Sequence, residues 1–302
     1  MLAFSSLLGN VEGQNIYRIW YDKPASYWEE ALPVGNGRIA AMVFGDPQLE
    51  QIQLNEETVS AGSPYQNYNE EAKTALPEMR RLIFEGKYEE AQNMAATKIL
   101  SQVGNEMPYQ TVGRLNIRYQ DHKKVNNYYR DLDISNAVAV TRYEVDGVEF
   151  TEETFASFTD QLVIRHIKAS KPGTINCELF FNTPMRDPKR SIYGKKGLRL
   201  EGITHGSRYF PGKVHYCADL DVKHKGGKVI TANDTLLSVQ GASELTLYIS
   251  MATNFVNYKD ISGDPYQRNK AYLKNAAKDY SKASRSYCCL SETIQSCNFG
   301  FG

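Results

Sequence analysis

The sequence predicts a mainly β protein built from antiparallel strands, with two short helices inserted between them. From Ile16 onward, most segments of this 302-residue chain alternate apolar and polar side chains and are rich in Val, Ile, Thr, Tyr and Phe. Clusters of Gly, Asp, Asn and Pro separate these segments, as they commonly separate strands. Helical spacing is confined to one internal region and one run near the C-terminus. Together these observations favour a large antiparallel β fold with helical additions.

The predicted strands begin near the N-terminus and continue through most of the chain. Val138–Val145 and Val148–Ser157 form the clearest pair, because Asp146-Gly147 between them supplies the positive φ angles that a two-residue hairpin turn needs. The complete set is Ile16–Tyr21, Ile39–Phe44, Gln48–Leu54, Leu115–Tyr119, Asn126–Asp133, Val138–Val145, Val148–Ser157, Gln161–Ala169, Ile175–Phe181, Leu198–Gly202, Val214–His224, Leu236–Gln240 and Leu245–Thr253.

Two short helices are expected between Glu70 and Leu100. Apolar side chains recur there at helical spacing, and Gly86 separates the first run from the second. A final helical run begins near Tyr266 and continues to Tyr280. The sequence does not show what this last helix would pack against.

Composition and spacing exclude several classes of function. The 35 Lys plus Arg residues balance 35 Asp plus Glu, whereas proteins that bind nucleic acid usually carry a basic surplus, so we expect no nucleic-acid partner. No apolar stretch approaches the roughly 20 residues that span a bilayer, so we expect no membrane partner. The histidines and cysteines lack metal-ligand spacing, and neither a metal nor a cofactor is expected. Cys177 and Cys217, alone on predicted strands, are interpreted as small buried residues.

The segment Gly35–Ala40 fits the G-x-G-x-x-A pattern of dinucleotide-binding loops. Such a loop follows a buried strand and opens a helix, but Pro33 precedes this segment and the turn Gly45-Asp46-Pro47 follows too soon. We therefore interpret the glycines as a tight turn before a strand. Neighbouring acidic pairs such as Glu152-Glu153 do not supply the two carboxyl groups that glycoside hydrolysis needs across one pocket, because neighbours on a strand point to opposite faces.

Several ordered strings nevertheless carry a resemblance to a known family. Together they resemble the N-terminal part of glycoside hydrolase family 95, which comprises α-L-fucosidases with some α-L-galactosidases. One departure is Val59–Ser63, which stands where family members have a Leu-Trp-Ser-Gly-Gly stretch. The strings are Ile19–Ala25, Trp28–Arg38, Ala41–Gly45, Gln53–Thr58, Leu76–Glu78, Phe84–Tyr88, Pro108–Gln110, Tyr129–Asp133, Ala252–Phe255 and Ser262–Pro265.

The resemblance implies a β-super-sandwich N-terminal domain over residues 16–265 and the start of a helical linker over residues 266–284. An (α/α)6 catalytic barrel would then be the packing partner, and it would hydrolyse terminal α-L-fucosyl linkages of fucosylated or related oligosaccharides by inversion. The family's catalytic groups belong to that barrel, so no catalytic residue can be assigned to this sequence. The chain alone is expected to be inactive.

The two ends of the chain depart from this pattern. Residues 1–15 are interpreted either as the remnant of a signal peptide or as a disordered extension, and the resemblance implies a periplasmic or secreted parent enzyme. The match ends near Ala283, where an atypical tail over residues 285–302 begins. Our hypothesis is a frameshift or gene truncation near Ser284.

The candidate substrate-binding residues are those that a domain of this kind could contribute to the rim of a sugar pocket. Amide and guanidinium groups can hydrogen-bond sugar hydroxyls, and flanking glycines let the backbone come close. The alternative interpretation is that the same side chains stabilise turns and the domain interface. These candidates are Asn36, Arg38, Asn55, Glu56 and Thr58.

Three functions therefore stay open. The first is a scaffold for a catalytic barrel, the second is a stand-alone carbohydrate-binding module, and the third is a fucosidase that depends on Glu56. Trp20 and Trp28 could stack on a sugar face, but we expect Trp20 to be buried on its strand.

Overall fold

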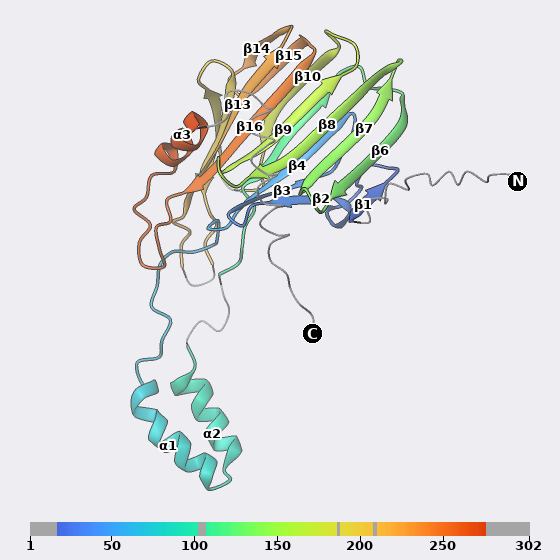
Figure 1. Ribbon diagram of the computed structural model, residues 1–302. Helices are drawn as coiled ribbons and strands as arrows, with labels where there is room; N and C mark the ends of the chain where they lie inside the picture. The colour runs from blue at the N-terminus through green and yellow to red at the C-terminus, as the bar shows by residue number, and fades with distance from the viewer. Residues whose placement is uncertain (1–16, 102–106, 186–187, 208–209, 276–302) are drawn as a thin grey trace, which may run out of the picture.

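The computed structural model describes residues 17–101, 107–185, 188–207 and 210–275. These residues form a sandwich of two large β-sheets, a helical arm that projects away from it and a helix packed on one sheet (Figure 1). Neighbouring strands pair antiparallel in both sheets. The prediction of a mainly β antiparallel sandwich with inserted helices is confirmed.

Sheet A contains nine strands in the order β1-β6-β7-β8-β9-β16-β13-β12-β11, and sheet B contains seven in the order β14-β15-β10-β5-β4-β3-β2. In sheet A the bounds are β1 Arg18–Tyr21, β6 Val125–Asp133, β7 Val138–Val145, β8 Val148–Ser157, β9 Leu162–Ala169, β16 Glu244–Thr253, β13 His215–Lys225, β12 Gly197–Ile203 and β11 Lys189–Tyr193. In sheet B they are β14 Lys228–Asn233, β15 Leu236–Ala242, β10 Ile175–Asn182, β5 Gly113–Tyr119, β4 Leu49–Glu56, β3 Ile39–Val43 and β2 Leu32–Gly35.

The main hydrophobic core lies between the two sheets. Along β4 every second side chain is buried, so Ile52 and Leu54 face the core while their neighbours face outward. On the opposite sheet, Leu247 and Ile249 of β16 join the same cluster. Each fully buried aliphatic side chain contributes about 1.5–3 kcal/mol relative to exposure. Cys177 and Cys217 are buried and free, as predicted.

The hairpin predicted at Asp146-Gly147 is present. Val145 pairs with Val148, and the two turn residues have φ angles of 50° and 74°. Both angles lie in the left-handed region that a type I′ turn requires. The local sequence therefore determined the register of β7 and β8.

Three strands were not predicted from the sequence: β2, β11 and β14. Each lies at an edge of its sheet. Edge strands are partly solvated, so their side chains need not alternate, and most residues of β11 and β14 are exposed. Pro33 lies within β2, where a missing N–H is tolerated because an edge strand has a free side.

The prediction that Trp20 is buried on its strand is wrong. Its side chain is 61% exposed, because β1 is also an edge strand and most of its residues face solvent. The indole stacks on the ring of Tyr129 of the adjacent strand β6, with a centroid distance of 6.3 Å. Trp28, in the short 3-10 helix Trp28–Glu30, is 48% exposed.

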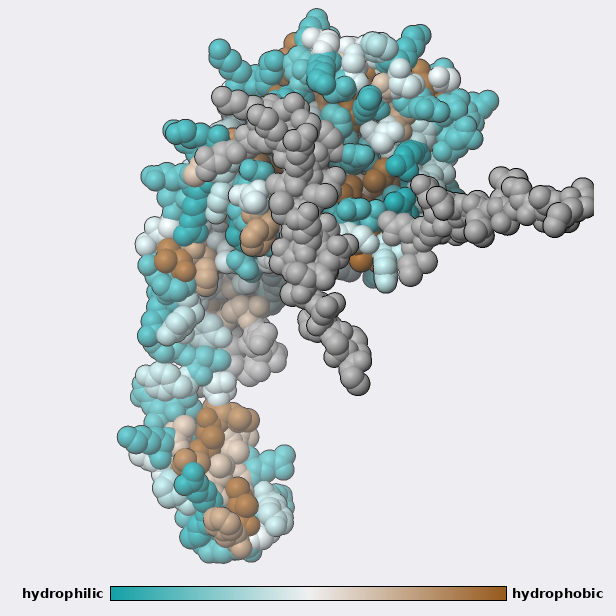
Figure 2. Space-filling model, in the orientation of Figure 1, coloured by the Kyte–Doolittle hydropathy of each residue, from teal (hydrophilic) through white to brown (hydrophobic). Residues whose placement is uncertain are grey.

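The helical arm consists of α1, Ala72–Phe84, and α2, Tyr88–Met94, which continues into a π-helical turn over Ala95–Ile99. Gly86 separates the helices at a φ of 74°, as the sequence predicted. Two chain segments connect the arm to the sandwich, and they are joined by an isolated β-bridge between Ser60 and Tyr109. The arm stands away from the sheets, and hydrophobic residues gather on its surface (Figures 1 and 2).

The last helix, α3, spans Pro265–Asn275 and lies on the face of sheet A that is turned away from sheet B. Tyr272 and Leu273 pack there against a second, smaller core that includes Phe155, Ile164 and Tyr248. The helix is thus part of the sandwich body. Residues 1–15, the remainder of the expected linker and the tail with its cysteines lie outside the described residues.

Candidate functional site

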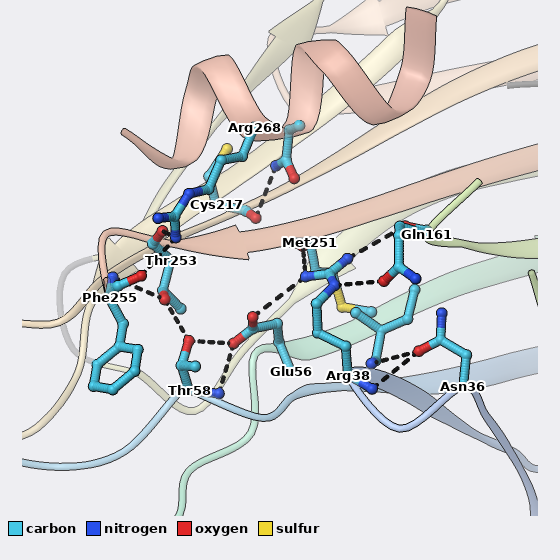
Figure 3. A network of polar contacts seen from close by, with 12 residues as sticks. Asn36, Arg38, Glu56, Thr58, Gln161, Cys217, Met251, Thr253, Phe255 and Arg268 are labelled. Atoms are coloured by element: carbon cyan, nitrogen blue, oxygen red, sulfur yellow. Dashed lines mark hydrogen bonds and ion pairs between the residues drawn. The ribbon is translucent and has the colours of Figure 1, made fainter. Parts of the chain in front are cut away.

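Four of the five candidate residues meet at one end of the sandwich (Figure 3). Asn36 and Arg38 lie in the turn between β2 and β3, Glu56 ends β4, and Thr58 follows it. The ends of the two sheets come together here, because Arg38 reaches the backbone of Met251 on β16 of sheet A. We call this set of contacts the end network.

Arg38 is the centre of the end network. Its Nη1 donates hydrogen bonds to the Met251 carbonyl at 2.8 Å and to Glu56 Oε1 at 3.3 Å. Its Nε donates to Gln161 Oε1 at 2.7 Å, and the guanidinium lies over the Tyr272 ring at 4.7 Å. One side chain therefore joins sheet B to sheet A, to the β8–β9 turn and to α3.

Glu56 is buried and fully engaged. The backbone N–H and the hydroxyl of Thr58 donate to Glu56 Oε2 at 2.8 and 2.6 Å. The Thr58 hydroxyl also contacts the Thr253 hydroxyl on β16. Burial raises the pKa of Glu56 above its usual value, while the Thr58 hydrogen bonds and the Arg38 charge oppose that rise. These contacts leave the carboxylate little freedom to act on a ligand.

Asn36 shapes the turn that carries Arg38. Its Oδ1 accepts hydrogen bonds from the backbone N–H groups of Arg38 and Ile39 at 3.1 and 2.9 Å, and its Nδ2 donates to the Ser157 carbonyl at 2.9 Å. Gly37 between them has a φ of 93°, which an L side chain rarely adopts. The glycine turn predicted from the sequence is therefore held by an asparagine bridge to the second sheet.

Asn55 lies apart from the other four candidates. It precedes Glu56 on β4, and side chains of consecutive strand residues point to opposite faces. Glu56 faces the interior, so Asn55 faces outward, opposite Ala40 of β3. The structure thus separates Asn55 from the end network.

Other members of the network were not singled out from the sequence. Arg268 of α3 donates from Nη1 to the carbonyls of Thr253 and Phe255 at 2.9 and 2.6 Å, and Gln161 binds Arg38. Thr253 and Phe255 belong to a string that carried the family resemblance, but nothing in the local sequence distinguishes a backbone carbonyl that accepts from a distant arginine. The pairing exists only in the folded chain.

A second polar cluster lies inside the sandwich and was also missed. Arg165 donates from Nη2 to Glu50 Oε2 at 2.8 Å and to Glu152 Oε2, and all three side chains are buried. Tyr119 and Tyr143 donate to Glu152 Oε1 at 2.6 and 2.7 Å. One feature of the sequence could have indicated this cluster: Glu50 lies on the same face of β4 as the buried residues Ile52 and Leu54.

Burial raises the pKa of Glu50 to about 7, although the Arg165 charge acts in the opposite direction. The backbone N–H groups of Phe44 and Gly45 also donate to its Oε1, at 3.1 and 3.0 Å. Two carboxylates share one guanidinium here, so one acidic proton can be held near neutral pH. Because the cluster is enclosed in the sandwich core, we interpret its role as structural.

Two hollows lie in this part of the molecule. An apolar hollow of about 490 Å³ adjoins the end network and is lined by Thr58, Phe255, Tyr258 and Ile261 among others, with Glu57 as its acidic residue. A polar hollow of about 570 Å³ lies at β12, β13 and the start of α3, with Glu201 as its acidic residue. Among the described residues, no group of three His, Cys, Asp or Glu side chains is placed to hold a metal ion.

No helix in the described ranges is long and apolar enough to cross a membrane. A family model described as glycosyl hydrolase family 65, N-terminal domain, matches residues 19–258.

Two curated relatives extend the comparison. Alpha-L-fucosidase 2 of Arabidopsis thaliana is 31% identical over 271 residues, which cover 81% of this chain and 31% of that protein. The protein named "Probable alpha-fucosidase A" of Aspergillus niger is 25% identical over 290 residues, with 90% and 35% coverage. The chain thus spans about a third of the length of these relatives.

Proposed function

This chain belongs to the family described as glycosyl hydrolase family 65, N-terminal domain, and from that membership we propose that it is the non-catalytic sandwich domain of a glycoside hydrolase similar to α-L-fucosidases. Both curated relatives are named as fucosidases, which supports the class of parent enzyme. The sandwich would then act as a scaffold for a separate catalytic domain.

The end network carries this proposal. Arg38 and Glu56 direct their hydrogen bonds to each other, to Thr58 and to the backbone of sheet A. Glycoside hydrolysis requires two carboxyl groups roughly 5–9.5 Å apart across a pocket. Each of the two hollows described above offers one acidic residue, Glu57 or Glu201. The arrangement favours a structural part for the candidate residues over a catalytic one.

The chemistry of the parent enzyme is part of the same proposal. It would hydrolyse terminal α-L-fucosyl linkages of oligosaccharides by inversion, in an (α/α)6 barrel that packs against this sandwich. The relatives' names and the share of their length that lies outside the match support this division of labour. An exported, periplasmic or secreted parent enzyme is also proposed.

A carbohydrate-binding module is the second candidate function. The polar hollow favours it, because convergent polar side chains beside an aromatic ring are suited to sugar hydroxyls. A module of this kind and a scaffold are compatible within one domain.

The test measures release of L-fucose from 2′-fucosyllactose by the purified chain, with the full-length Arabidopsis relative as the active control. We expect no release, and no difference between the chain and its Glu56→Gln variant. Fucose release by the chain that Glu56→Gln abolishes would contradict the proposal, because Glu56 would then be part of a reaction centre.

A further inference from the structure

The polar hollow combines side chains of four different kinds. Its lining includes Lys189, Glu201, His205, His215 and Tyr266. Its volume of about 570 Å³ lies within the range of small-molecule binding sites. None of these residues belongs to the end network, so the hollow is a separate feature of the domain.

The sheet and the last helix place these side chains together. Lys189 pairs with Glu201 across β11 and β12, at the edge of sheet A. His215 pairs with Ile203 across β12 and β13. Tyr266 lies at the start of α3, where its hydroxyl interacts with the Glu201 carboxylate. Regular strand pairing therefore fixes two walls of the hollow, and the helix supplies a third.

The backbone that carries both histidines is also fixed. His205 donates its N–H to Gln110 Oε1 at 2.9 Å, and its carbonyl accepts from the Gly62 N–H at 3.1 Å. The N–H of His215 donates to Asn254 Oδ1 at 2.9 Å. A ligand that uses these imidazoles would not have to order the backbone first, which lowers the entropic cost of binding.

Three side chains in the hollow retain hydrogen-bonding capacity. Within the described ranges, the imidazoles of His205 and His215 and the ammonium group of Lys189 make no hydrogen bond or ion pair with another side chain. An imidazole can both donate and accept, and an ammonium group donates. Hydroxyl groups, which do both, match this set of partners.

The charge of the lining selects the class of ligand. The lining carries one positive charge, Lys189, and one negative charge, Glu201, so the hollow has no surplus of positive charge for an anion. The exposed part of the Tyr266 ring offers an apolar face beside these polar groups. We propose that the polar hollow binds a neutral oligosaccharide through its hydroxyl groups. The choice of a fucosylated probe rests on the proposed function.

The test follows binding of 2′-fucosyllactose to the whole isotope-labelled chain by NMR shift titration. We expect saturable shifts, a dissociation constant raised about tenfold by Lys189→Ala or by His215→Ala, and a larger rise in the double variant. Both side chains are exposed at strand positions, so the variants should keep the fold. The control is Lys228→Ala on β14, another exposed lysine on an edge strand, in the other sheet, which should bind as the parent does.

Three results would overturn the inference. Absence of saturable shifts would exclude a sugar site, and unchanged binding by the double variant would exclude this location. Tighter binding of inorganic sulfate than of the sugar, with the same shifts, would show an anion site. Each of these leaves the scaffold proposal intact, because that proposal is decided by fucose release.

Discussion

Two arginines, the partly buried Arg38 and the fully buried Arg130, link distant parts of the chain. Arg38 joins both sheets and α3 at one end of the sandwich. Arg130 of β6 donates to the carbonyls of Lys23 and Glu30, both at 2.7 Å, and so anchors the N-terminal segment. Both arginines lie in strings that resemble the fucosidase family, so a string that marks a family can hold structural contacts as readily as a ligand site.

Removal of the Arg38 side chain should therefore lower stability. In Arg38→Ala, the buried Glu56 carboxylate loses its cationic partner and the Met251 carbonyl loses a donor. We expect the free energy of unfolding to fall by about 2–3 kcal/mol, measured by urea denaturation. The control Arg80→Ala changes an exposed side chain of α1 and should stay within about 0.5 kcal/mol of the parent. Equal effects of the two substitutions would refute this account of the end network.

The Glu50 carboxyl should make stability depend on pH. Because burial raises its pKa in the folded protein to about 7, the folded chain holds this proton at pH values where the unfolded chain has released it. The contribution of Glu50 is full below about pH 4.5 and is lost as the pH rises to about 7. The lowered pKa of His122 acts with the opposite sign, since it favours the fold as the pH rises.

Comparison with Glu50→Gln isolates the carboxyl from the His122 contribution. Between pH 4.5 and pH 7.5 the unfolding free energy of the parent should fall by up to about 3 kcal/mol more than that of the variant. Urea denaturation at intervals of pH measures both slopes. Glu90→Gln, at an exposed position of α2, should follow the parent. Identical slopes for the parent and Glu50→Gln would show that Glu50 does not hold a proton in the fold.

Among the structural elements, the helical arm has the least support from tertiary packing. Its buried apolar residues are Ala75, Leu82 and Ala91, and two short helices with so small a core gain little stability of their own. Where the arm leaves the sandwich, its two connecting segments are held together by backbone hydrogen bonds that do not involve the helices. These run from the Ala61 N–H to the Pro108 carbonyl and from the Gln110 N–H to the Val59 carbonyl. The sandwich should therefore fold without the arm.

Replacement of residues 67–105 by a short Gly-Ser linker tests that independence. We expect the β-sheet circular dichroism to be retained and the midpoint of thermal unfolding to change by only a few degrees, because about 1 kcal/mol corresponds to roughly 2–4 °C in a protein of this size. Glycine-serine replacement of β2 removes an edge strand whose Leu32 and Val34 are buried, and it should unfold the protein. Loss of the fold in the arm deletion would show that the arm contributes to the core.

For the molecule as a whole, charge and exposed apolar surface act together. Net charge is zero at neutral pH, so no long-range repulsion separates two copies. Phe84 is 88% exposed and Tyr88 is 69% exposed, both beside the Gly86 turn of the arm. Figure 2 shows further hydrophobic residues along the surface of the arm. An exposed apolar surface of this kind promotes association.

The double variant Phe84→Ser/Tyr88→Ser should associate less than the parent. We expect its mean mass by light scattering at high protein concentration to fall toward that of the 34.1 kDa monomer. Phe158→Ser, at an apolar residue that is 54% exposed in the β8–β9 turn, is the control and should leave association unchanged. If Phe158→Ser has the same effect as the double variant, the arm is not the site of association.

Local patterns were sufficient for the fold class and for most central strands. Alternation of apolar and polar residues located them, Asp146-Gly147 fixed one hairpin, and Gly86 divided the arm into two helices. These signals act within a few residues, because side-chain direction and positive φ angles depend on the immediate backbone. The edge strand β2 was not predicted from the sequence, because it contains Pro33, which is compatible with an edge strand but not with the centre of a sheet.

The sequence by itself determined the antiparallel β class, the β7–β8 hairpin and the helical arm, since each depends on local backbone preference and periodicity, whereas the sandwich was implied by the family resemblance. Only the tertiary structure decided that Arg38 meets Met251, that Glu56 rather than Asn55 lies on the buried face of β4, and that α3 covers sheet A. Those contacts join residues far apart in the chain or depend on which face of a strand is buried. These contacts form because the two sheets pack against each other, and no local pattern in the sequence encodes that packing.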